Sequence, residues 1–462
     1  MMTVYLQTLL QAMRPAFARE ATFVWFVVVF AGFVTRTDAY GVSSIVRALW
    51  LAPACYPCLL HFFHSSAWTA RGLLEQWWRL LANEKNTYLV GERVVLLGDH
   101  TKNVKDGRRM PGVSTLHQDS ETASKPSFFR GHHWGCLSML MRRGAKKFSA
   151  MPLWAEIHND CTSESRAVRI VVVALQIARV LGRPAYLVLD AFFASGPVFE
   201  TTGREAGRLH ILTRAKKSYV GYLPIQQPKK RKPGRPRQFG ERLKLMDLFE
   251  DREHMFKTAE TIVYDKVETV RYLTIDLLWK PVKGKIRFFL IESSRGRIVL
   301  MTSDLCMEPL VAINLYCRRV SIETLFDTLK NLLGAMQYHF WSKYLHPVSR
   351  RPARNKQSKP YSTRPERTKN TLAAIEKFVV VQLLVVGSLQ LLAGRFVSEI
   401  GDRAHCWLRT PCGPIPSEFV TRTALSNIIR TNLIRFGKDW ITQLILGKQE
   451  TSENTRNLEV AA

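Results

Sequence analysis

The 462-residue sequence predicts an α/β protein in which a sheet core carries a β-rich insertion and is flanked by helical regions. Short apolar runs that are typical of buried strands occupy residues 92–100 and 185–190. Between them, an amphipathic run at 164–182 ends at a glycine, which indicates a helix. Further on, the stretch 270–301 combines β-branched and aromatic residues with glycine-containing turns, and this pattern indicates several hairpin-linked strands.

The core elements are expected in a fixed order along the chain. Three strands come first, and a helix and two more strands follow them. The expected segments are strands at 92–100, 112–118 and 127–143, a helix at 164–182, and strands at 185–190 and 209–216. A helix containing residues 316–330 is expected after the insertion.

Changes in composition divide the chain into seven regions. Pro-rich and basic stretches indicate loops or linkers, and the polar C-terminal end indicates disorder. The predicted regions are a helical N-terminal region (1–85), the first part of the core (86–215), a β-rich insertion with a basic loop (216–297), the second part of the core (298–345), a basic linker (346–370), a C-terminal helical region (371–448) and a disordered tail (449–462).

Positively charged residues far outnumber negatively charged ones. The chain has 67 Lys and Arg residues against 38 Asp and Glu residues, a net charge of +29. With 46% hydrophobic residues the chain is expected to fold, so this excess indicates a polyanionic partner, most often nucleic acid. An anionic membrane surface is the alternative partner. The apolar stretches 21–34 and 378–393 are shorter than the ~20 residues that span a bilayer, so we expect buried helices and no membrane partner.

Two carboxylates follow two of the predicted strands. Asp99 ends the strand at 92–100 and Asp190 ends the strand at 185–190. If these strands are neighbours in one sheet, both carboxylates emerge at the same edge, and a later helix carrying Glu323 can bring a third carboxylate beside them. Carboxylate oxygens suit Mg²⁺ or Mn²⁺, and two such ions support phosphoryl transfer. The sequence therefore predicts a site for a divalent metal.

The segment 316–330 carries four polar side chains along one side of the predicted helix. At 100° per residue they fall within an arc of roughly 60°, beside an apolar stripe that would pack on the core. The simplest interpretation is a solvated face with an i,i+4 ion pair between Arg319 and Glu323. The alternative is that these charges meet the two aspartates at a site. The four side chains are Tyr316, Arg319, Glu323 and Lys330.

The spacing Y-(2)-R-(3)-E-(6)-K in this segment resembles the signature of insertion-sequence transposases of the IS-four type, in the DDE superfamily. The stretches LLGDHTKNVKDGRRMPGV and YLVLDAFFASG resemble the surroundings of that family's two catalytic aspartates. The resemblance covers most of residues 86–345 and implies an RNase H-like mixed sheet. It also implies that Asp99, Asp190 and Glu323 are the catalytic residues and the metal ligands. Asp304, which follows another strand-like run, is the alternative second aspartate.

The resemblance further implies cut-and-paste DNA transposition with Mg²⁺ or Mn²⁺, and two ions are expected. Arg319 and Lys330 would hold phosphates of the DNA end, and Tyr316 would contact a phosphate or position its neighbours. The implied partners are double-stranded DNA, as terminal inverted repeats and target, and a second copy of the chain in a synaptic complex. The helical N-terminal region would recognise the repeats, in a bacterial, nucleoid-associated cytoplasmic setting. A catalytically silent, transposase-derived DNA-binding protein is the alternative.

Three other features are candidate DNA contacts. The stretch RKPGRPRQ resembles an AT-hook, so Arg235 and Arg237 are expected to enter a narrow minor groove, with a solvated basic loop as the alternative. Lys102 and Lys105 follow the first aspartate and are candidates to steer a phosphate backbone, although an ordinary solvated loop explains them equally well. Trp279 is, by the resemblance, a candidate to stack on a flipped base, with a core position as the alternative.

Overall fold

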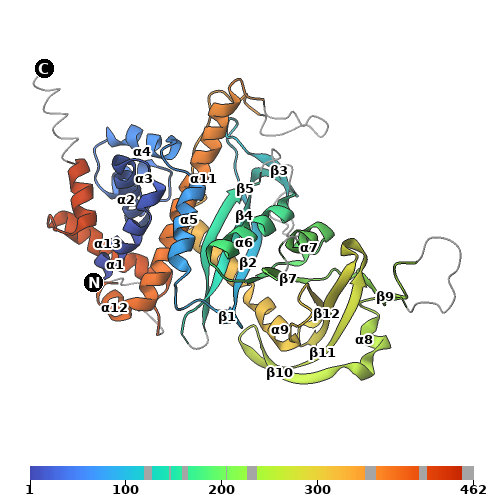
Figure 1. Cartoon of the computed structure of the whole chain (residues 1–462). Helices are drawn as coiled ribbons and strands as arrows, with labels where there is room; N and C mark the ends of the chain where they lie inside the picture. Colours follow the sequence, from blue (N-terminus) through green and yellow to red (C-terminus); the bar gives the residue numbers. More distant parts are fainter. Residues whose placement is uncertain are drawn as a thin grey trace, which may run out of the picture.

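The computed structural model shows one large sheet with helices from both ends of the chain packed beside it (Figure 1). Helices of the N-terminal and C-terminal parts lie together on one side, and the β-rich region extends away from them on the other. The structure describes residues 1–118, 127–144, 147–158, 165–203, 205, 207–225, 237–348, 361–404 and 414–449.

Five strands form the core of the sheet in the order β5–β4–β2–β6–β7. The strands β2, β6 and β7 are parallel, while β4 runs antiparallel to both β2 and β5. This mixed order, with α6 crossing between β5 and β6, is the RNase H-like arrangement, so the predicted fold class is confirmed. The elements are β2 (Arg93–Val104), β4 (Phe128–Arg142), β5 (Phe148–Ile157), α6 (Arg166–Val180), β6 (Ala185–Val188) and β7 (Leu209–Arg214).

The third core strand, β5, was not among the predicted strands. Its sequence contains Pro152, which removes a backbone donor and makes a strand a poor prediction. In the structure the pairing with β4 shifts register beside this proline, and the bulge accommodates it. The strand predicted at 112–118 exists as β3 (Ser114–His117), but it pairs with the start of β4 at the sheet edge.

The β-rich region continues the core sheet. Its last strand pairs with β7 in antiparallel register, and β12, β11 and β8 follow outward. The predicted insertion therefore shares one hydrogen-bonded sheet with the core. Its elements are β8 (Val220–Tyr222), β9 (Arg242–Lys244), α8 (Leu248–Asp251), β10 (Lys257–Val263), β11 (Lys266–Trp279), β12 (Gly284–Ser293) and β13 (Gly296–Thr302), and the short strand β1 (Leu89–Val90) pairs with β2.

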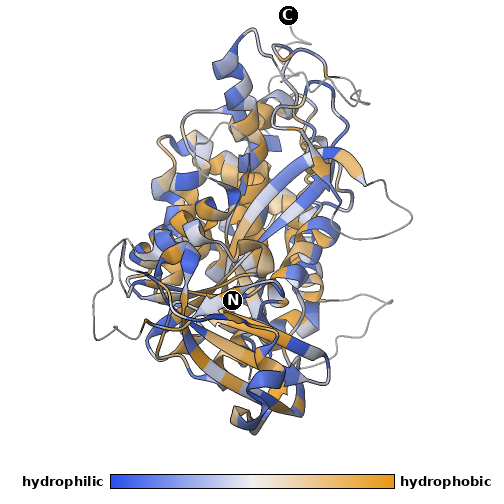
Figure 2. Ribbon diagram, turned by 90° about the vertical axis from the view of Figure 1, so that its right-hand side faces the viewer, coloured by the Kyte–Doolittle hydropathy of each residue, from blue (hydrophilic) through white to orange (hydrophobic). Residues whose placement is uncertain are grey.

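Helices from the two ends of the chain pack against each other and against the sheet. The long helix α11 packs on β5 and contacts α2, α4, α5 and α13. It begins at Pro365, so it includes the end of the segment predicted as a linker. Figure 2 shows apolar segments along strands and central helices. The helices are α1 (Met2–Ala12), α2 (Glu20–Thr35), α3 (Ser43–Ala48), α4 (Cys55–His64), α5 (Ala70–Leu81), α7 (Gly196–Gly203), α11 (Pro365–Arg395), α12 (Val397–Arg403), α13 (Glu418–Ile434) and residues 440–449.

Both apolar stretches are buried helices, as expected. The stretch 21–34 forms most of α2, and 378–393 lies within α11. By length and composition alone α11 is the one helix of the described chain able to cross a membrane, yet 83% of its apolar window is buried inside the protein.

Candidate active site

Asp99 and Asp190 lie at matching places on neighbouring parallel strands. The pairing of β2 with β6 ends at Leu97 opposite Val188, and each aspartate stands two residues beyond that last pair. Contrary to the prediction, Asp99 does not end its strand, because β2 continues to Val104 through its pairing with β4. Asp190 follows the end of β6 by two residues and caps a short 3₁₀ turn by accepting a hydrogen bond from the Phe192 amide at 2.8 Å.

The segment that carries Glu323 is not one regular helix, which corrects the prediction for 316–330. Helix α9 (Pro309–Arg318) ends before Arg319, α10 (Ser321–Asp327) follows, and a π-helical turn (Thr328–Leu332) completes the segment. At the break the amide of Glu323 bonds to the carbonyl of Val320, three residues back. A spacing of 100° per residue therefore does not hold across this segment, so the helical wheel does not predict where the Lys330 side chain points.

Arg319 joins two of the three carboxylates. One guanidinium nitrogen donates to Oδ2 of Asp99 at 3.0 Å, and the other donates to Oε1 of Glu323 at 2.8 Å. The side chains of Arg319 and Asp99 are 19% and 17% exposed, whereas that of Glu323 is 53% exposed. The i,i+4 pair between Arg319 and Glu323 therefore forms, as the simpler interpretation predicts. Arg319 also reaches Asp99, as the alternative interpretation predicts.

The electrostatics of Asp99 reflect crowding of negative charge. Burial and the nearby charge of Asp190 raise the pKa of Asp99 to about 6, and Arg319 opposes this shift. A divalent cation would relieve the same repulsion, and an all-carboxylate donor set suits Mg²⁺ or Mn²⁺, so the residues fit the expected metal. Within the described chain, however, no group of three or more His, Cys, Asp or Glu side chains is close enough to hold one ion. The guanidinium of Arg319 is the cation between these carboxylates in this structure.

Lys330 and Tyr316 have neighbours close to this ion-pair group. The Lys330 ammonium donates to the Thr101 hydroxyl at 2.5 Å, and Thr101 follows Asp99 by two residues on the same face of β2. Tyr316 is half-buried, and burial raises the pKa of its phenol against the opposing charges of Arg319 and Arg214. Arg214 ends β7 and was missed by the sequence reasoning. Its place at the end of the strand predicted after β6 was the available signal.

The chain from Arg319 onward follows one face of β2. Lys330 bonds to Thr101, and the Asn103 amide then donates to the Met336 carbonyl at 3.3 Å. Lys105 comes next and donates to the carbonyls of Met336 at 2.6 Å and Tyr338 at 3.2 Å. Residues 319–338 therefore run beside β2, from Asp99 toward the C-terminal end of the strand.

The structure corrects the prediction that Lys105 contacts DNA. It is 7% exposed, its ammonium lies 4.1 Å from the Tyr338 ring centroid, and burial lowers its pKa to about 8. A side chain so enclosed holds the protein together and does not reach a DNA backbone in this structure. Lys102, by contrast, is half-exposed and donates to the His117 carbonyl at 2.7 Å.

The structure also corrects the prediction that Trp279 stacks on a flipped base, because Trp279 is a core residue. It is 3% exposed, and its ring centroid lies 5.4 Å from that of Phe199 and 5.6 Å from that of Tyr219. No base can stack on an indole enclosed in this way. Arg237 is exposed, and Arg235 lies outside the residues that the structure describes.

Asp304 lies toward the N-terminal ends of the parallel strands, whereas Asp190 follows the C-terminal end of β6. It accepts a hydrogen bond from the Tyr186 hydroxyl at 2.6 Å, near the start of β6, and the adjacent Ser303 pairs with Ile211 near the start of β7. The structure therefore places Asp190, and not Asp304, in the electrostatic neighbourhood of Asp99.

Arginines from both ends of the chain hold the end of the π-helical turn. Arg422 on α13 donates to the carbonyls of Leu332 at 2.6 Å and Val34 at 3.0 Å. Arg36, directly after α2, donates to the Leu333 carbonyl and to the side chain of Gln382 on α11.

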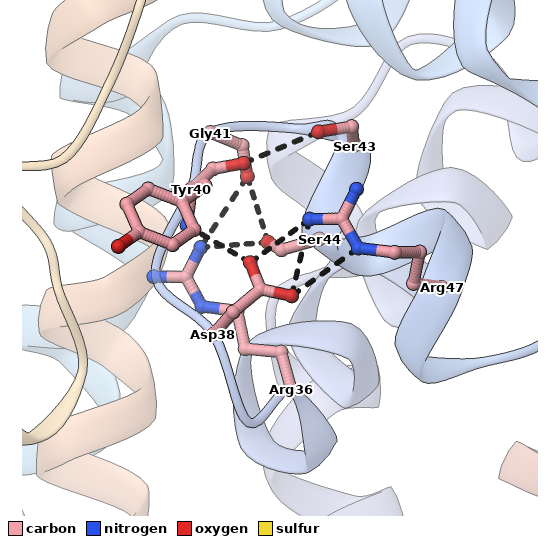
Figure 3. Close-up of polar contacts among 7 residues, drawn as sticks. All are labelled: Arg36, Asp38, Tyr40, Gly41, Ser43, Ser44 and Arg47. Carbon is pink, nitrogen blue, oxygen red and sulfur yellow. Dashed lines mark hydrogen bonds and ion pairs between the residues drawn. The ribbon is translucent and has the colours of Figure 1, made fainter.

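Figure 3 shows the other contacts of Arg36. Its guanidinium is turned toward the first turn of α3, where it donates to the Ser44 hydroxyl at 3.1 Å, and beside it Asp38 pairs with Arg47. Burial and the charge of Arg422 lower the pKa of Arg36 to about 9. The N-terminal and C-terminal helical regions thus fix the segment that carries Lys330.

Comparison with known proteins identifies the class of this protein. A model of the DDE superfamily endonucleases matches residues 12–274, more than half of the chain. The chain therefore belongs to the DDE superfamily of endonucleases. The matched part contains Asp99 and Asp190 and ends before Glu323. No curated protein matches the sequence. One similar solved structure is the piggyBac transposase synaptic complex with hairpin DNA, with 11% sequence identity and a TM-score of 0.34 over 94% of this chain and 76% of that chain.

Proposed function

We propose that this endonuclease-family protein is a transposase of the IS-four type, which cleaves DNA at the ends of its own element and transfers the freed strand ends to a target. The observation that carries the proposal is the meeting of Asp99, Arg319 and Glu323 beside the end of parallel strands. Lys330 contacts Thr101, two residues further along β2 than Asp99. Carboxylates for a metal and cations for phosphate oxygens are the two sets of groups that DNA phosphoryl transfer requires.

Each side chain has a proposed role. Asp99, Asp190 and Glu323 would hold two Mg²⁺ or Mn²⁺ ions, which supply an activated water or 3′-hydroxyl and stabilise the leaving oxygen. Arg319, once its carboxylate partners bind metal, is free to hold a phosphate with its planar guanidinium. Lys330 would hold a second phosphate oxygen, because its ammonium already lies along the same strand face.

The proposed partners follow from this activity and from the charge of the chain. A net charge of +29 supports binding of double-stranded DNA, both at terminal inverted repeats and at the target. Two copies of the chain would hold two element ends in a synaptic complex, with the N-terminal helices recognising the repeats. The proposed setting is the bacterial cytoplasm, at the nucleoid.

A cleavage assay tests the proposal. Purified protein is incubated with Mg²⁺ and linear DNA that carries the sequences flanking the gene, and the wild type is compared with Glu323→Gln. The matched control is Glu260→Gln, an exposed glutamate in the β-rich region. Cleavage at defined ends by wild type and Glu260→Gln, with loss in Glu323→Gln, is the expected result.

Two other results would overturn the proposal. Specific DNA binding by all three proteins with cleavage by none would identify a silent DNA-binding protein. Equal cleavage by all three would remove Glu323 from the site.

A further inference from the structure

Trp341 is an exposed indole between two hollows in the surface. It is 65% exposed and lines both a cavity of about 560 Å³ and a second cavity of about 310 Å³. Arg108, Arg109 and His339 border the first cavity, and Lys343 borders the second. A large flat ring with open space at its sides and cations around it has the features of a stacking platform for nucleic-acid bases.

The backbone that follows Trp341 is fixed by its contacts with Arg108 and Arg109. The amide of Ser342 donates to the Arg109 carbonyl at 3.0 Å, and the amide of Val348 donates to the Arg108 carbonyl at 2.9 Å. The guanidinium of Arg109 donates to the Lys343 carbonyl at 3.0 Å. The indole is therefore carried by a tethered segment, which lowers the entropy lost when a ligand stacks on it.

Charge around the indole is predominantly positive. Arg108, Arg109, Lys343 and Arg367 are exposed and line the two cavities. The exposed acids nearest in sequence to these residues are Asp106 and Glu366. A polyanion fits this surface, and the exposed ring selects a polyanion that carries flat apolar groups.

The surface is connected to the carboxylate site by β2. The chain 319–338 follows that strand from Asp99 to Lys105, and Trp341 comes three residues after Tyr338, beside Arg109. The five residue-to-residue steps of strand from Asp99 to Val104 span roughly 17 Å, which corresponds to about five base pairs of duplex. One DNA molecule can thus contact both places.

We propose that Trp341 is a base-stacking platform that holds an unpaired base of the DNA substrate while Arg108 and Arg367 contact the adjacent phosphates. The proposal rests on the proposed function for the identity of the polyanion, and it assigns the stacking role to a residue outside the β-rich region. The platform would hold DNA about five base pairs or more from the cleaved phosphate.

Binding of a fluorescein-labelled oligothymidylate, measured by anisotropy in EDTA, tests the platform without requiring cleavage. An abasic oligomer of equal length has the same phosphates and no bases. Stacking contributes about 1–3 kcal/mol per base, so Trp341→Ala is expected to weaken oligothymidylate binding by about tenfold and to leave abasic binding unchanged. Trp341→Phe should retain most of the affinity. Trp50→Ala, at an exposed tryptophan outside both cavities, is the matched control.

A second measurement separates phosphate contact from stacking. Arg108→Gln should weaken both oligomers and reduce the dependence of log K on log salt concentration by about 0.7, the value for one phosphate contact on a single strand. Equal oligothymidylate affinity in the wild type, Trp341→Ala and Trp50→Ala would overturn the platform. Because no divalent metal is present, loss of cleavage in the earlier assay and loss of stacking in this one are independent outcomes.

Discussion

Arg319 donates a hydrogen bond to Asp99 across 220 residues of sequence, at 3.0 Å. The same guanidinium also holds Glu323, so a single cation pairs with two carboxylates that come from different elements. Without metal, this pairing keeps a buried aspartate charged beside Asp190. In the proposed function, metal would compete with Arg319 for the same oxygens, and loading the site would free the guanidinium for DNA.

Metal affinity should depend on pH near the raised pKa of Asp99. An aspartate titrates ordinarily near 4, but here the pKa is about 6, so protons compete with metal up to that value. We expect the apparent Mn²⁺ affinity to fall by roughly tenfold per pH unit below about 6 and to be nearly constant above it. Titration of free Mn²⁺ by electron paramagnetic resonance measures this.

Asp99→Asn serves as the control for that titration. It removes the titrating group, so its weaker Mn²⁺ binding should no longer follow the same pH dependence. An affinity for the wild-type protein that is constant between about pH 5 and 7 would contradict the assignment of Asp99 as a ligand.

Trp279 should matter for stability and not for DNA binding. Replacing this enclosed indole in Trp279→Ala leaves a cavity between Phe199 and Tyr219, so the free energy of unfolding should fall by about 3–5 kcal/mol. Denaturant unfolding measures the loss. Trp50→Ala, at an exposed site, should change stability by less than about 0.5 kcal/mol. An unchanged stability in Trp279→Ala would return the residue to the list of DNA contacts.

Lys105 should behave as a structural residue. In Lys105→Met the carbonyls of Met336 and Tyr338 lose their donor, which should cost about 1–3 kcal/mol of stability. The salt dependence of DNA binding should be the same as in the wild type, because no phosphate contact is lost. Lys369→Met, at an exposed lysine on α11, should leave stability unchanged. A reduced salt dependence in Lys105→Met would show that the side chain reaches DNA after all.

Arg422 should control the motion of the turn that carries Lys330. Its guanidinium bonds to the carbonyls of Leu332 and Val34, so Arg422→Met leaves the end of the π-helical turn without this tie. Amide hydrogen exchange should become faster in the peptide covering 328–335, with β6 unchanged. Arg435→Met, just after α13 and exposed, is the control. Equal exchange in the two variants would mean that the turn is held by its packing alone.

The core of the fold could be predicted because its signals are local. The apolar runs of β2 and β6 and the glycine-ended helix between them follow from side-chain period and from breakers. The strand β5 could not be predicted, because Pro152 argues against a strand and only pairing with β4 at a bulge compensates for it. The sheet continuing from β7 into the β-rich region is likewise a long-range pairing.

The sequence by itself determined which side chains could form the site: the aspartates that follow two apolar runs, and the spacing that contains Arg319 and Glu323. The tertiary structure decided their relation. Parallel pairing of β2 with β6 placed Asp99 beside Asp190, and a broken helix directed Lys330 to Thr101. Packing also decided which of the other candidate side chains are exposed, because exposure is a property of the folded chain. Trp279 and Lys105 are enclosed, and Trp341 lies at the surface.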